Sequence, residues 1–186
     1  MSDYRGEPGT IIDLIQRDHR LIKGMLDRFD TAPRHEWGKL FQEFVDYSLR
    51  HEIAESEVVF PALRRVVPGS EGVVDDCLAE QAAMEARLSA MEELDPTTPE
   101  FREELSRIRD DQSRHATHEE QVVLPMLRGQ QIADLGELAK AYDAARAVAP
   151  GHPAPAGTGK GELPSGWVAA LADRIRTLLS RGALGR

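Results

Sequence analysis

Residues 51–64 read HEIAESEVVFPALR, and residues 115–128 read HATHEEQVVLPMLR. Both strings contain a histidine, a glutamate four positions later, a Val-Val pair and a proline, all at an offset of 64 residues. The match extends upstream along a stripe with 4-3-4-3 spacing, which is typical of one face of an α-helix. The paired positions are Trp37/Phe101, Phe41/Leu105, Phe44/Ile108, Ser48/Gln112, His51/His115, Glu55/Glu119, Val58/Val122 and Ala62/Met126.

The segments that precede these two helices also match each other, at an offset of 62 residues. Their pairs are Ile12/Val74, Ile15/Cys77, His19/Gln81, Ile22/Met84, Leu26/Leu88 and Phe29/Met91. The chain therefore reads as a duplicated helical hairpin. Four helices with such stripes and short loops predict an all-α, up-down-up-down antiparallel four-helix bundle.

Turn and capping residues give the approximate bounds of the four helices, which are 8–30, 33–67, 70–95 and 98–128. Pro61 and Pro125 lie near the ends of the second and fourth helices, where each is expected to kink or terminate its helix. One or two extra helices are expected after the bundle. The predicted divisions are the bundle at 1–130, a fifth helix at 131–148, a Pro/Gly-rich linker at 149–164 and a C-terminal amphipathic helix at 165–186.

The composition is that of a globular protein, with 186 residues, 41% hydrophobic and 30% charged, and a formal net charge of −9. The acidic balance argues against nucleic acid as the main partner. No apolar run approaches the roughly 20 residues that cross a bilayer, so we expect no membrane association. The N-terminal MSDYRGEPGT lacks the pattern of a signal peptide, and the single cysteine, Cys77, fits a reducing compartment. We therefore expect a cytoplasmic monomer or homodimer.

Polar residues interrupt the four apolar stripes at one common level. These residues are His19, His51, Glu55, Gln81, His115 and Glu119. A buried carboxylate costs several kcal/mol unless a cation or a proton balances it, and the stripes contain no Lys or Arg. Each His-x-x-x-Glu places a nitrogen and an oxygen donor one turn apart on a helix face, a donor set that suits iron, manganese or zinc. Two His–Glu hydrogen bonds without metal are the alternative, but two equivalent copies favour metal.

Three strings carry a resemblance to a known family: DHRLI around His19, HEIAESEVVFPAL, and HATHEEQVVLPML. Over about residues 9–128 the chain resembles the hemerythrin-like HHE cation-binding family, and its Pro-rich tail is similar to that of actinobacterial members. The resemblance implies a four-helix bundle around a non-haem di-iron centre with an oxo or hydroxo bridge. The family's ligand pattern is one His, HxxxE, His and HxxxE along the four helices.

The sequence departs from that pattern at Gln81, which stands where the family has the histidine of the third helix. The roles that the resemblance implies are His19 and His51 on one iron, Glu55 and Glu119 as bridges, and His115 on the other iron. An amide oxygen is a weaker ligand than imidazole, so the resemblance implies a second site that binds less tightly or lies more open. Three nearby residues are candidate replacement ligands: His118, Glu85 and Cys77.

Family members bind or sense dioxygen, respond to nitric oxide or peroxide, store iron or repair iron centres. The resemblance therefore implies a binder, sensor or scavenger of dioxygen, peroxide or nitric oxide, with catalase-like turnover left open. An iron or zinc carrier without redox function, holding zinc or a single iron, is one alternative. A metal-free structural or interaction bundle is the other. The sequence contains no nucleophile triad, Gly-rich phosphate loop or nucleotide motif that favours a different chemistry.

Overall fold

The computed structural model describes residues 9–129 and 135–152, and this part of the chain is all-helical. The α-helices are α1 (Ile11–Asp27), α2 (Trp37–Ala54), α3 (Phe60–Val66), α4 (Glu71–Met91), α5 (Pro99–His118), α6 (Leu124–Gly129) and α7 (Leu135–Val148). The 3-10 turns η1 (Arg28–Asp30) and η2 (Arg34–Glu36) connect α1 to α2. Two π-helical segments, η3 (Glu55–Val59) and η4 (Glu119–Val123), join α2 to α3 and α5 to α6. Five continuous rods result in the described ranges.

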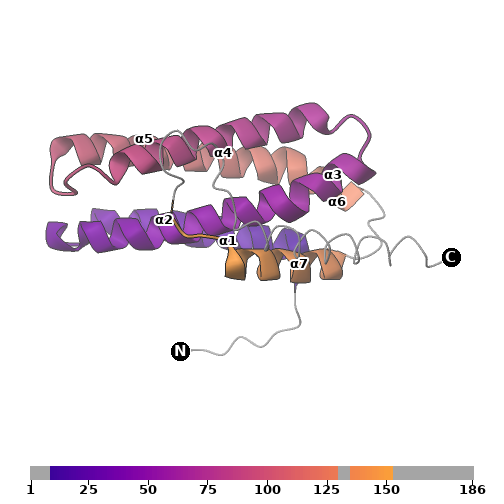
Figure 1. Cartoon of the computed structure of the whole chain (residues 1–186), viewed down its shortest axis with the longest axis horizontal. Coiled ribbons are helices and arrows are strands. Elements are labelled where there is room, and N and C mark those ends of the chain that lie inside the picture. The colour runs from indigo at the N-terminus through magenta and orange to yellow at the C-terminus, as the bar shows by residue number, and fades with distance from the viewer. Residues whose placement is uncertain (1–8, 130–134, 153–186) are drawn as a thin grey trace.

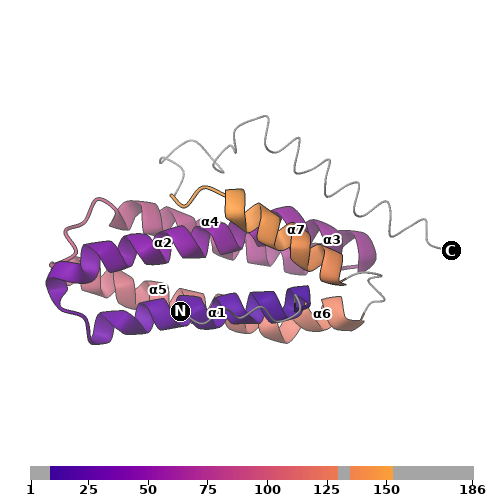
Figure 2. The same ribbon diagram turned by 90° about the horizontal axis from the view of Figure 1, so that it is seen from below.

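Four of the rods form the predicted bundle (Figure 1). The first rod packs against α2 and α5, and α4 packs against the same two helices from the other side. This arrangement confirms the all-α bundle. The fifth rod, α7, lies along the face made by α1, α2 and η3 (Figure 2). The linker and terminal helix predicted at 149–164 and 165–186 lie outside the described residues, apart from residues 149–152.

Side-chain hydrogen bonds cap the first residues of two helices, α1 and α5. Thr10 and Asp13 form a capping box at α1, and the Thr98 hydroxyl accepts from the Phe101 N–H at α5. The predicted cap Ser70 precedes α4 but makes no capping hydrogen bond. Gly69 lies in the turn before α4 and has a φ of 83°, a conformation that glycine adopts without strain. No helix in the described ranges is long and apolar enough to cross a membrane.

Pro61 and Pro125 were expected to kink or terminate their helices, and the structure excludes termination. Each proline is the second residue after a π-helical segment, and the rods continue beyond it to Val66 and Gly129. A proline has no N–H and its ring crowds the preceding turn, so an α-helix cannot accommodate it unchanged. The wider π turn shifts the hydrogen-bond register immediately before the proline. Such turns are rare, and they often mark functional sites.

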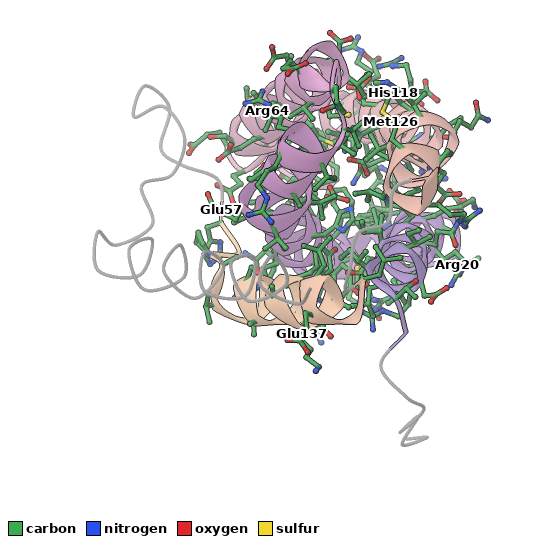
Figure 3. All side chains as sticks on the ribbon, turned by 90° about the vertical axis from the view of Figure 1, so that its right-hand side faces the viewer. Arg20, Glu57, Arg64, His118, Met126 and Glu137 are labelled. Atoms are coloured by element: carbon green, nitrogen blue, oxygen red, sulfur yellow. The ribbon has the colours of Figure 1, made fainter. Side chains whose placement is uncertain are left out.

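The apolar core has two parts. One cluster gathers residues of α3, α6 and α7 with the first turns of α1 and α4. The other gathers the far halves of α1 and α4 with the starts of α2 and α5, and it includes Trp37, Phe41, Phe44 and Phe101. The view along the rods shows side chains filling the space among them, with α7 closing the side marked by Glu137 (Figure 3). Buried polar residues separate the two clusters.

Candidate metal centre

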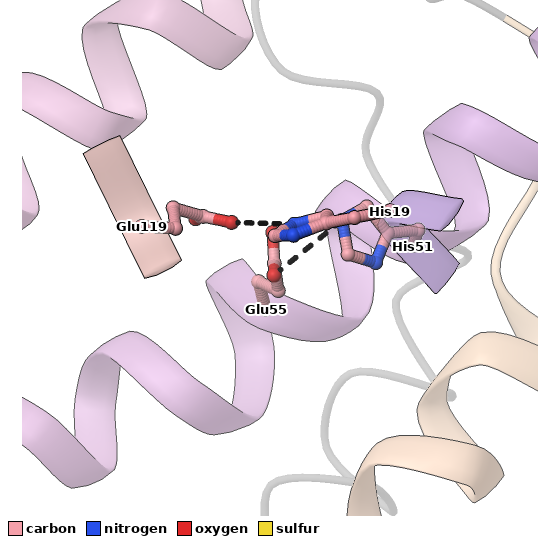
Figure 4. Close-up of side chains that lie close together, drawn as sticks. All are labelled: His19, His51, Glu55 and Glu119. Carbon is pink, nitrogen blue, oxygen red and sulfur yellow. Dashed lines mark hydrogen bonds and ion pairs between the residues drawn. The ribbon is translucent and has the colours of Figure 1, made fainter. Parts of the chain in front are cut away.

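Four of the predicted ligands meet in the bundle interior (Figure 4). His19, His51, Glu55 and Glu119 each place one donor atom within 4.8 Å of the others. All four side chains are buried. They come from α1, from α2 and from the first residue of each π-helical segment. The two repeats therefore place their glutamates on the same kind of distorted turn.

The duplicated His–Glu pairs have matching geometry. The distance from His51 Nε2 to Glu55 Oε1 is 3.5 Å, and that from His115 Nε2 to Glu119 Oε1 is also 3.5 Å. His115 Nε2 and Glu119 Oε1 are buried and lack a hydrogen-bond partner. The two atoms face each other as an ion pair that is too long for a good hydrogen bond, and a shared cation would satisfy both of them. A metal ion held by both at about 2.1 Å fits that separation, so these residues fit a bound ion.

Burial and neighbouring charges shift the pKa values of the clustered side chains. Burial, followed by the negative charge of Glu119, raises the pKa of Glu55 well above its usual value. Burial alone would also raise the pKa of Glu119, but His115, His19 and His51 lower it overall. Burial lowers the pKa of His51 to about 3, which keeps its imidazole neutral, the form that binds metal. Burial alone would lower the pKa of His19 and of His115, but their contacts with Glu119 and its neighbours raise it overall, so these two imidazoles balance the carboxylates. A bound ion would displace their protons and the proton on Glu55.

Gln81 lies against the site through its amide. Its Nε2 donates to Glu55 Oε2 at 3.1 Å, while its Oε1 accepts from the Ser56 hydroxyl at 2.8 Å. The oxygen that would bind a metal is thus engaged with Ser56, and the amide nitrogen contacts the glutamate. In this arrangement Gln81 positions Glu55. Its predicted role as a ligand stays a prediction.

The three candidate replacement ligands lie apart from the four clustered residues. His118 and Cys77 approach each other and Glu80, forming a separate group of donors between α4 and α5. Glu85 is half-buried, and its charge acts on the buried Glu52. The predicted ligand His115 connects the two groups, because its Nδ1 lies 2.8 Å from Glu80 Oε2.

The fifth rod contributes residues that the sequence did not single out. Tyr142 of α7 is fully buried, and its hydroxyl lies 2.6 Å from His51 Nδ1 while donating to Asp18 Oδ2 at 3.0 Å. Asp18 also accepts from Tyr47 and from Arg146. A hydrogen bond at Nδ1 fixes the ring orientation of a histidine whose Nε2 is needed elsewhere. This network holds Nε2 of His51 toward Glu55.

A second buried chain of polar groups runs from Gln112 to Glu52. Gln112 Nε2 donates to the Ser48 hydroxyl at 2.8 Å, and that hydroxyl donates to Glu52 Oε1 at 3.3 Å. Burial raises the pKa of Glu52 to about 7. Ser48 and Gln112 belong to the predicted inward stripe. Glu52 directly follows His51 but sits one position off that stripe, so helical periodicity does not predict its burial.

A pocket of about 440 Å³ opens between α1 and α5 beside the cluster. Its wall includes His19, whose Nδ1 contacts Glu120 Oε1 at 2.9 Å, and it also includes Ala116. Arg20 and Lys23 lie on the same wall. The pocket brings solvent to one imidazole of an otherwise buried centre.

Comparisons with known proteins agree with this arrangement. No curated protein sequence matches the chain. Among solved structures, a Hemerythrin HHE cation binding domain-containing protein from Mycobacterium kansasii, described as an Rv2633c homologue, has a similar fold with a TM-score of 0.65. The two chains are 19% identical, and the similarity covers 94% of this chain and 99% of the other. The family profile for the Hemerythrin HHE cation binding domain matches residues 10–127. The chain therefore belongs to the Hemerythrin HHE cation binding domain family.

Proposed function

We propose that this protein holds two metal ions, with iron as the physiological metal, and acts on dioxygen, peroxide or nitric oxide. One observation carries the proposal: two repeat-related His–Glu pairs have equal 3.5 Å separations, and in one of them neither facing atom makes a hydrogen bond. Matched half-sites on opposite helices are suited to two ions that share the carboxylates between them. The family supports cation binding, and the choice of iron rests on the mixed imidazole and carboxylate donors.

The residues give the two half-sites different tasks. The half built on His51 has a second imidazole in His19 and a ring orientation fixed by Tyr142. The half built on His115 faces no third-rod histidine, because Gln81 stands there. Bound iron would supply reversible one-electron chemistry, and the poorer half-site would leave a coordination position for a small molecule. The pocket beside His19 offers such a molecule a route inward.

Metal analysis of the protein purified from iron-replete cells tests the proposal. We expect two iron ions per chain and a visible absorption spectrum. His115→Ala should reduce the content to one ion, while the exposed His35→Ala serves as a matched control with two. A single colourless zinc would favour a carrier, and a folded protein without metal would favour a structural bundle. Either result contradicts the proposal.

Binding and turnover are separated by a second measurement. We expect the iron-loaded protein either to evolve dioxygen from hydrogen peroxide, as a scavenger does, or to shift its absorption spectrum reversibly with dioxygen or nitric oxide. A catalase-like rate that disappears in His115→Ala would assign turnover to this centre. Iron-loaded protein that responds to none of the three molecules would limit the function to iron carriage.

A further inference from the structure

Outside the buried cluster, one group of side chains combines a thiol, a carboxylate and an imidazole. Cys77 and Glu80 lie one turn apart on α4, and His118 is the last residue of the facing helix α5. Their donor atoms all lie within 4.8 Å of one another. In the view along the rods, His118 lies on the side of the bundle away from Glu137 and α7 (Figure 3). We call these three residues the outer triad.

The distances within the outer triad fit a tetrahedral ion. Cys77 Sγ lies 3.9 Å from His118 Nδ1, and His118 Nδ1 lies 3.4 Å from Glu80 Oε1. Bond lengths of about 2.3 Å to sulfur and about 2.0 Å to nitrogen or oxygen predict tetrahedral edges of about 3.5 Å and about 3.3 Å. Two of the three edges therefore approach the required values without movement of the helices.

One residue of the outer triad is buried and the other two are partly exposed to solvent. Cys77 is fully buried, whereas the side chains of Glu80 and His118 are 33% and 25% exposed. An ion could enter from solvent and keep a water as its fourth ligand. Glu80 is also held in place by the neighbouring imidazole, because its Oε2 accepts from His115 Nδ1 at 2.8 Å. Both carboxylate oxygens of Glu80 lie near His118 Nδ1, Oε1 at 3.4 Å and Oε2 at 3.5 Å.

We propose that Cys77, Glu80 and His118 form a second metal site, open to solvent, for a divalent ion of borderline softness such as Zn²⁺ or Fe²⁺. A thiolate together with imidazole and carboxylate selects such ions over Mg²⁺ or Ca²⁺. On binding, Cys77 gives up its S–H proton and the ion gives up water molecules. The site is connected to the buried centre by one carboxylate, since Glu80 contacts both the outer ion and His115.

Cobalt(II) provides a selective probe, because Cys77 is the single cysteine of the chain. A thiolate-to-cobalt charge-transfer band in the near ultraviolet can therefore arise only from an ion bound to Cys77, and its loss in His118→Ala and Glu80→Gln assigns that ion to the outer triad. Burial raises the pKa of the Cys77 thiol well above its usual value, so the thiolate is absent without an ion and the background is low. The full chain should be titrated with cobalt(II) while absorbance and circular dichroism are followed.

We expect the band to saturate with one cobalt ion and to be displaced by Zn²⁺. His118→Ala and Glu80→Gln should each weaken cobalt binding at this site by at least tenfold, and Cys77→Ser should abolish the band. His35→Ala, which removes an exposed histidine outside the group, should leave the titration unchanged. Absence of the band in the full chain, or an unaltered titration in His118→Ala, would overturn the proposal.

If Cys77→Ser disrupts the core and fails to fold, the variants at the partly exposed Glu80 and His118 still test the proposal. The result is also independent of the proposed function. A chain that holds no iron in the buried centre would still give the band if the outer triad binds. A di-iron chain without the band would refute the outer triad alone.

Discussion

Replacing Glu52 by glutamine tests whether the buried layer carries an uncompensated carboxyl group. The side chain is 4% exposed, its oxygen accepts from Ser48, and burial raises its pKa from the ordinary 4.5 to about 7. The glutamine side chain keeps the acceptor for Ser48 and nearly the same volume, but it cannot ionise. The substitution therefore removes the proton equilibrium of Glu52, together with the negative charge that acts on Glu55 and His115.

The sign and size of the effect follow from linkage. Between pH 4.5 and about 7 the unfolded chain ionises Glu52 while the folded chain keeps it protonated, so the stability contributed by this group is complete below pH 4.5 and is lost as the pH rises toward 7. At about 1.4 kcal/mol per pH unit, the loss amounts to about 3 kcal/mol. Glu52→Gln should therefore match the parent near pH 4.5 and exceed its stability by about 3 kcal/mol at about pH 7.5.

The assay is denaturant unfolding of chelator-treated protein from about pH 4.5 to about pH 8, because a nearby cation would itself lower the pKa of Glu52. The half-buried Glu57→Gln is the matched control, since it removes a carboxylate from the same rod but not from the core. We expect the control to change the free energy of unfolding by about 0.5 kcal/mol or less. A stability difference for Glu52→Gln that stays constant across this range would refute the reasoning.

Three further substitutions probe the centre and its access. Tyr142→Phe removes the hydroxyl that contacts His51 Nδ1. It should lower the free energy of unfolding, measured with denaturant, by about 1–3 kcal/mol. It should also weaken metal binding, measured by chelator competition, by about tenfold to a hundredfold. Gln81→His should replace the amide near Glu55 with a nitrogen ligand and raise the protein's affinity for the second ion by about tenfold. Unchanged metal content would contradict this prediction. Ala116→Phe should narrow the pocket beside His19 and slow azide binding in stopped-flow measurements several-fold, with metal content unaltered. An unchanged rate would place the entrance elsewhere.

The duplication made the fold and the inward stripe predictable. A helical period repeated at offsets of 64 and 62 residues fixes which positions share a face, so it correctly predicted that His19, His51, Glu55 and Glu119 lie at one level. Local periodicity, however, says nothing about contacts between a bundle and a rod outside the repeat.

The residues that were missed depend on such distant contacts. Tyr142 falls within the predicted fifth helix at 131–148, and only the packing of α7 on α1 and α2 brings it to His51. The two π-helical segments were missed for a different reason. The repeat preserves one extra residue per turn in both halves, so comparing the halves with each other leaves no offset to detect.

The division of the apolar core into two clusters affects how the molecule behaves as a cooperative unit. The tryptophan of the described residues, Trp37, belongs to one cluster, whereas Tyr142 belongs to the other. Apolar contacts within each cluster keep that end of the bundle folded, while the layer between them consists of groups that prefer water or a cation. An ion bound by residues of several helices at this layer would therefore also couple the folding of the two ends. Its binding energy becomes the coupling energy that lets the two ends of the bundle unfold as one.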